Sequence, residues 1–150
     1  MIAFLPKDWF FIDVEENASA DIIAVAVNPD YTLAAVFSVI RNTEKNDKVI
    51  EQEGLTGLAR LNLARRQRKT GGAVRQVGDF ATIQMGQLSF AKYDFTAEEG
   101  GTPSQAAVFI SSADKCYEFS LIPMHIKTKQ LPARTDIDKI FRSILATVQY

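Results

Sequence analysis

The clearest pattern of apolar and polar positions lies close to the C-terminus of the chain. Apolar residues recur there with the spacing of one side of an α-helix, at Ile137, Ile140, Phe141, Ile144, Leu145 and Val148. Thr135 and Asp138 match an acidic variant of the capping box that begins many helices. The pattern predicts an amphipathic helix that starts at about Thr135 and buries one whole side.

Near the N-terminus, β-branched residues are concentrated in two short runs, Ile22–Val27 and Leu33–Ile40. Residues 28–31 separate them, and the proline and two Asx residues of this segment favour a turn. We therefore expect a β-hairpin. Residues 4–11 are also apolar and aromatic, and a proline within them predicts an edge strand in which Trp9 is buried.

A long helix is expected from about residue 48 to residue 69. Asn46 or Asp47 is a suitable cap, and acidic residues in the early turns and basic residues in the last turn complement the helix dipole. Its apolar positions at helical spacing are Ile50, Leu55, Leu58, Ala59 and Leu61.

Glycines interrupt and end this predicted helix. Gly54 and Gly57 each weaken a helix by about 1 kcal/mol relative to alanine, so we expect a kink or close packing there. The pair Gly71 and Gly72 is expected to terminate the helix, since glycine readily adopts the left-handed conformation of a helix C-terminus.

Between residues 73 and 122 the pattern changes to short alternating segments with turn residues between them. They predict an antiparallel meander of strands at residues 74–77, 81–85, 88–95, 105–111 and 116–122. The first two are separated by a turn expected at Gly78 and Asp79.

The period of two assigns side chains of this meander to the two faces of a sheet. Along the last strand, one set contains Tyr117, Phe119 and Leu121 and the other contains Cys116, Glu118 and Ser120. In residues 88–95 the apolar positions change phase, so we expect a β-bulge near Ala91 and Lys92 that keeps all the large side chains inward. Together the elements predict an α+β fold, in which helices cover an antiparallel sheet as an α/β/α sandwich.

Composition and charge narrow the class of protein. The 150 residues fit one domain, residues 1–150, and 47% hydrophobic and 23% charged residues are typical of a globular chain. A net charge of -1 excludes a globally basic nucleic-acid binder. A single cysteine excludes an intramolecular disulfide, and a single histidine excludes a multi-histidine metal site.

No apolar run approaches the roughly 20 residues that span a bilayer, so no membrane span is expected. Residues 1–8 lack the basic and apolar regions of a signal peptide, which predicts a cytoplasmic chain as written. An exported protein from which a signal has been removed would begin in the same way, so the compartment stays open.

One charged segment is asymmetric, because no acidic residue falls between residues 60 and 75. Its cations are Arg60, Arg65, Arg66, Arg68, Lys69 and Arg75. A patch of this kind is able to dock an acidic protein surface, an anionic lipid layer or RNA phosphates. The simpler alternative is a helix end that complements its own dipole. Aromatic residues are not interleaved with the arginines, which argues against nucleic-acid binding by base stacking.

Candidate catalytic residues are few. His125, the sole histidine, is expected in an exposed loop, and Cys116 is expected to be a small buried apolar residue. The acidic clusters Glu98 with Glu99, and Asp13 with residues 15–16, lack the ligand spacing of a calcium loop. The glycine pairs lack both the phosphate-loop and the dinucleotide pattern. We therefore predict no metal, no cofactor and no catalysis.

Several segments together resemble the family that contains the PsbP photosystem subunits, the DcrB-type bacterial proteins and the Ran-binding Mog-type proteins. They are Leu5-Pro6-Lys7-Asp8-Trp9, residues 90–95, residues 117–121 and residues 138–145. The resemblance covers nearly the whole chain and implies an α/β/α sandwich with a role in binding or assembly. It transfers no catalytic residue, because the family has no shared catalytic motif.

The hypothesis from the sequence is a non-catalytic protein-interaction or assembly module whose partner is another protein. A homodimer is left open. Two alternatives remain: a chaperone that shelters an apolar helix of a client, and a small ligand-binding or hydrolytic enzyme that uses carboxylates. An exposed apolar patch favours the chaperone, whereas a deep pocket with converging carboxylates favours the enzyme.

Overall fold

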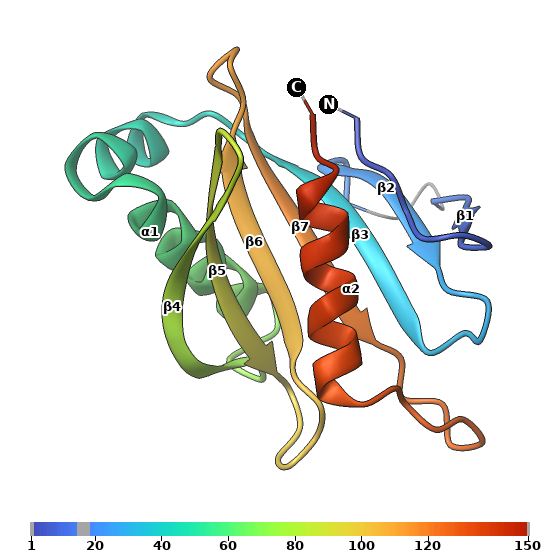
Figure 1. The fold of residues 1–150 in the computed structure, drawn as a ribbon. Coiled ribbons are helices and arrows are strands. Elements are labelled where there is room, and N and C mark those ends of the chain that lie inside the picture. The colour runs from blue at the N-terminus through green and yellow to red at the C-terminus, as the bar shows by residue number, and fades with distance from the viewer. Residues whose placement is uncertain (1, 15–18, 150) are drawn as a thin grey trace.

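The computed structural model describes residues 2–14 and 19–149, which contain one antiparallel sheet with a helix on each face (Figure 1). The order of strands across the sheet is β1-β2-β3-β7-β6-β5-β4. The strands are β1 (Phe10–Ile12), β2 (Ile22–Val27), β3 (Leu33–Ile40), β4 (Arg75–Met85), β5 (Leu88–Thr96), β6 (Ser104–Ile110) and β7 (Cys116–Pro123). The helices are α1 (Glu44–Lys69) and α2 (Arg134–Ala146). This architecture confirms the predicted α+β class.

The C-terminal helix α2 buries its predicted apolar stripe against one face of the sheet. Phe141 is fully buried, and its ring stacks on Phe119 of β7 with centroids 5.4 Å apart. The predicted capping box is wrong, because α2 begins at Arg134 and its cap residue, Ala133, makes no side-chain hydrogen bond. Asp138 instead accepts hydrogen bonds from Gln105 and Arg142, so a contact with the sheet replaces the local cap.

The long helix α1 packs on β4, β5 and β6 on the opposite face. It begins at Glu44, and the hydroxyl of Thr43 accepts a hydrogen bond from the Asn46 amide at 3.1 Å. The predicted cap at residues 46–47 is therefore wrong by about one turn. Leu58 and Ala59, which the periodicity assigned to the apolar side, are fully buried against Tyr93 and its neighbours.

The glycines of α1 act as the sequence predicted. Gly54 has φ 69° and ψ −155°, which interrupts the helix at that residue. A Cβ at Gly57 would lie 2.6 Å from Cγ1 of Val49, so the two parts of the kinked helix approach each other too closely for any side chain. Gly71 and Gly72 both have positive φ and follow the last helical residue.

Strand β5 is covered on both faces, which corrects two predictions. Its pairing with β6 is continuous, so the bulge expected at Ala91 and Lys92 is wrong. Phe90 packs in the cluster under α2, whereas Tyr93 packs in the cluster under α1. The irregularity lies in β4 between Val77 and Ala81, where a turn had been expected, and β4 continues through it.

The N-terminal segment is mostly not a strand. Only Phe10–Ile12 forms β1, and the prediction of a strand over residues 4–11 is wrong for the earlier part. Leu5 and Trp9 instead pack against the cluster under α2. The amide of Phe4 donates to the hydroxyl of Thr147 at 2.9 Å, which places the two ends of the chain side by side (Figure 1).

Candidate functional site

Helix α1 covers only half of its face of the sheet. The other half is formed by β1, β2, β3 and β7. Residues that are directly opposite each other on neighbouring strands point to the same face of a sheet, so the residues of this half can be read from the strand pairing. One row of partners runs Phe10, Val27, Ala34 and Ile122, and the next runs Ile12, Val25, Val36 and Ser120. We call these two rows the open face. Its side chains are mainly apolar, and Ile12 remains 44% exposed.

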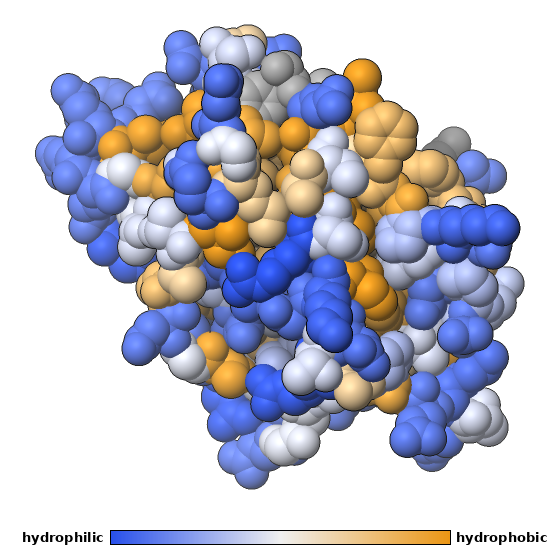
Figure 2. Space-filling model, viewed as in Figure 1, coloured by the Kyte–Doolittle hydropathy of each residue, from blue (hydrophilic) through white to orange (hydrophobic). Residues whose placement is uncertain are grey.

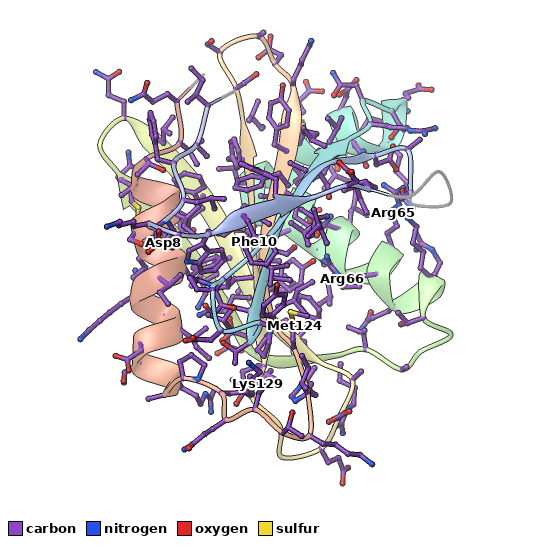
Figure 3. The ribbon with its side chains drawn as sticks, turned by 90° about the vertical axis from the view of Figure 1, so that its right-hand side faces the viewer. Asp8, Phe10, Arg65, Arg66, Met124 and Lys129 are labelled. Atoms are coloured by element: carbon purple, nitrogen blue, oxygen red, sulfur yellow. The ribbon has the colours of Figure 1, made fainter. Side chains whose placement is uncertain are left out.

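A groove of about 370 Å³ separates the open face from the C-terminal half of α1. Figure 3 views the sheet from its β1 edge, with α2 on one side and Arg65 and Arg66 of α1 on the other. The groove is lined by apolar residues of the sheet that include Val36 and Ile122, by Arg65, Arg66 and Lys69 of α1, and by the carboxylates of Asp21 and Glu118.

The inner end of the groove holds a buried ion pair. Arg66 Nη2 lies 2.5 Å from Glu118 Oε1, and only 7% of the Glu118 side chain is exposed. Asn62 donates to the other oxygen of Glu118 at 2.6 Å, and the hydroxyl of Ser120 also donates to this carboxylate. Arg66 further donates to the hydroxyl of Tyr93. The network therefore joins α1 to β5 and β7.

The network determines the charge state of Glu118. Burial alone would raise the pKa of this carboxyl, but the Arg66 guanidinium and the hydrogen bonds from Arg66, Ser120 and Asn62 outweigh it and lower the pKa. Burial raises the pKa of the Tyr93 hydroxyl, so that phenol stays protonated. Glu118 is thus held as a carboxylate whose charge is already compensated.

The outer end of the groove holds a second, more exposed ion-pair cluster. Asp21 Oδ2 accepts from Arg65 Nη2 at 2.6 Å, and Asp21 Oδ1 accepts from Arg41 Nε at 2.7 Å. The hydrogen bond from Arg65, followed by that from Arg41, lowers the pKa of Asp21 against the opposing effect of burial. Asp21 therefore ties α1 to the start of β2 and the end of β3.

The six cations of the basic segment do not share one surface role. Arg65 and Arg66 take part in the two clusters just described. Arg60 pairs with Glu53 and Arg75 pairs with Glu99, both at exposed positions. Among the described residues, Arg68 and Lys69 make no ion pair, and Lys69 lines the groove whereas Arg68 lies outside it. Whether any of the six contacts a partner stays a prediction.

The remaining candidate residues are dispersed. Cys116 is 3% exposed, as predicted, and burial raises the pKa of its thiol. His125 is exposed in the segment after β7, also as predicted. Glu98 and Asp13 are exposed. The described part of the chain holds no group of three or more metal-ligating side chains.

One of the predicted acidic clusters extends beyond the described residues, because Glu15 and Glu16 lie outside them.

Sequence reasoning missed the residues that organise the groove. Asp21 and Glu118 had no assigned role, although a signal existed at Glu118. This glutamate lies in a strand of aromatic and apolar residues, and a charged side chain in such a strand requires a buried partner. The partner, Arg66, was recognised only as one member of a basic segment.

Comparison with known proteins identifies a PsbP-like fold, in which an antiparallel sheet carries a helix on each face. The solution structure of cyanobacterial PsbP (CyanoP) from Synechocystis sp. PCC 6803 matches with a TM-score of 0.66, over 95% of this chain and 81% of that chain. The two sequences are 13% identical, so the likeness shows the fold. It confirms, at the level of the fold, the PsbP-like resemblance that the sequence motifs indicated.

A crystal structure from Bacteroides thetaiotaomicron VPI-5482 matches with a TM-score of 0.46 at 17% identity, over 97% of this chain and 42% of that chain, and adds nothing to the assignment. No protein-family model and no curated protein matches the chain.

Proposed function

We propose that the chain is a non-catalytic protein-interaction or assembly module, formed as one domain over residues 1–150. The observation that carries the proposal is the open face, where the described residues place no helix over the β1 and β2 side and Ile12 remains 44% exposed. Apolar surface that remains in contact with water is a common feature of protein-binding sites. The PsbP-like fold supports the same role, because the family resemblance implies binding or assembly.

The groove gives little support to the alternative of a carboxylate enzyme. General acid catalysis near neutral pH requires a carboxyl with a raised pKa. The two carboxylates in the groove, Asp21 and Glu118, have lowered pKa values and are both bonded to arginines. They act as structural anions that position α1 on the sheet.

The chaperone alternative has one observation in its favour. Large apolar residues are exposed on the N-terminal segment and on β1, at Ile2, Phe4 and Phe11. Figure 2 shows apolar residues gathered at the upper part of the α2 face, where this segment runs. Such a surface suits an apolar client helix. Within the described residues, no helix of this chain is long and apolar enough to cross a membrane itself.

Site-specific photocrosslinking tests the interaction proposal. A photoreactive amino acid at Val25 places the probe on the open face, and the same amino acid at exposed Thr82 of the β4 edge serves as the matched control. We expect discrete crosslinked products in the source cell from the Val25 probe and not from the Thr82 probe. The same products from both positions, or from neither, would contradict the assignment of the open face.

A probe at Phe4 separates the two roles. Crosslinks to many different proteins from Phe4 alone would favour the chaperone. A product of twice the chain mass from Val25 would identify the partner as a second copy of the chain.

A further inference from the structure

We infer that the groove between α1 and the open face is a binding site for a small molecule with one carboxylate and an apolar body. The inference goes beyond the proposed function, since it concerns a small ligand inside the groove, which shares Val36 and Ile122 with the open face, rather than a protein on that face. The groove volume of about 370 Å³ lies at the lower end of the range for small-molecule pockets, which is roughly 300 to 1,000 Å³. A small ligand therefore fits better than a nucleotide-sized one.

The charges lining the groove select an anion. Among the described residues, three cationic side chains and two carboxylates line it, which leaves one positive charge without a counterion. Arg66 already donates to Glu118 and Tyr93. Lys69 has no ion pair within the described part of the chain. The surplus charge therefore lies at the outer, accessible end of the groove.

Helix geometry gives the surplus charge a defined position. Arg65 and Lys69 are four residues apart, so they lie on the same side of α1, one turn from each other. The Arg65 side chain is 38% exposed and uses only one of its nitrogens on Asp21. A carboxylate placed between the two side chains can accept hydrogen bonds from both, and such charge-assisted bonds are stronger than neutral ones.

The remainder of the groove suits an apolar body. Val36 and Ile122 line it from the sheet, and the apolar groups of Ile22 and Ile40 extend the same lining. Burial of a hydrocarbon chain against these side chains removes its methylenes from water, which favours binding. An aliphatic carboxylate thus matches both the cations at the outer end and the apolar lining of the groove, whereas inorganic phosphate matches only the cations.

Three probes with the same apolar body test the inference: octanoate, octanol and octylamine. Binding is measured on the full chain by calorimetry and by NMR shift changes. We expect the order octanoate, octanol, octylamine in falling affinity, with the largest shifts at Val36, Ile122 and Lys69. When the salt concentration is raised from about 0.01 M to about 1 M, the affinity for octanoate is expected to fall, because salt screens the attraction between its carboxylate and the lysine and arginine side chains. The affinity for octanol is not expected to fall.

The variant Lys69→Gln supplies the decisive comparison. Lys69 has no partner in the described residues, so its replacement leaves the fold intact, and Arg68→Gln removes an unpaired cation one residue away that does not line the groove. An exposed ion pair is worth about 0.2 to 1 kcal/mol. We therefore expect about a 1.4-fold to fivefold loss of octanoate affinity in Lys69→Gln and none in Arg68→Gln.

Three results would overturn the inference. They are no detectable binding of octanoate, equal affinity for octanoate and octylamine, and equal losses in the Lys69 and Arg68 variants. Shifts confined to the exposed apolar residues of the N-terminal segment would show detergent-like adsorption and would overturn it as well.

Discussion

The buried pair of Arg66 and Glu118 allows a sharp test of how α1 is held on the sheet. The change is Arg66→Met, which preserves much of the apolar volume of the side chain and leaves the Glu118 carboxylate without its cation. Removal of one partner of a buried ion pair costs about 3 to 5 kcal/mol. The lower end, about 3 kcal/mol, applies here because 22% of the Arg66 side chain is exposed.

The pH dependence of the stability should also change sign. In the native protein the pKa of Glu118 is lowered. The ionised carboxylate therefore stabilises the fold at pH values above its unfolded-state pKa of about 4.3. This stabilisation is lost as the pH falls through the pKa of the folded state. Without Arg66, burial raises the pKa of Glu118 above the unfolded-state value. The free energy of unfolding of Arg66→Met should then increase as the pH falls from about 7 to about 5.

Urea unfolding followed by circular dichroism at these two pH values measures both effects. A loss of about 3 kcal/mol corresponds to a melting temperature lower by about 6 to 12 °C for a chain of this size. The double variant Arg66→Met with Glu118→Gln removes the uncompensated charge and should recover most of the loss at pH 7. The reasoning is wrong if the single variant loses under about 1 kcal/mol, or if its loss is the same at both pH values.

Three further predictions concern packing and reactivity. Gly57→Ala should lower the free energy of unfolding, measured in urea, by about 1 to 3 kcal/mol, because the new Cβ overlaps Val49. Alanine usually stabilises a helix relative to glycine, so a more stable variant would contradict this close approach. Phe141→Ala should lower the free energy of unfolding by about 3 to 5 kcal/mol in the same assay, since it leaves a cavity in the cluster under α2. A loss below about 1 kcal/mol would show that α2 is only loosely packed on the sheet. Cys116 should react with Ellman's reagent slowly in the folded chain and rapidly in urea, because its thiol is buried with a raised pKa; equal rates would place it at the surface.

Elements with a strong local pattern were predictable because one residue period dominates each of them. The hairpin of β2 and β3 has the predicted bounds, and the apolar stripe of α2 is the one that lies buried. The fold class followed from the order of these elements. Element ends were less predictable, since Thr43 caps α1 and Asp138 bonds to the sheet instead of capping α2.

The sequence by itself determined which residues are apolar on each element, and hence that helices cover an antiparallel sheet. Only the tertiary structure decided that β5 is buried on both faces and that Arg66 meets Glu118, 52 residues away along the chain. It also decided that Lys69 lies beside the groove with no ion-pair partner among residues 2–14 and 19–149. The physical reason is that periodicity records the burial of each side chain within its own element. Pairing of charges depends on which elements are packed together, and local spacing carries no record of that.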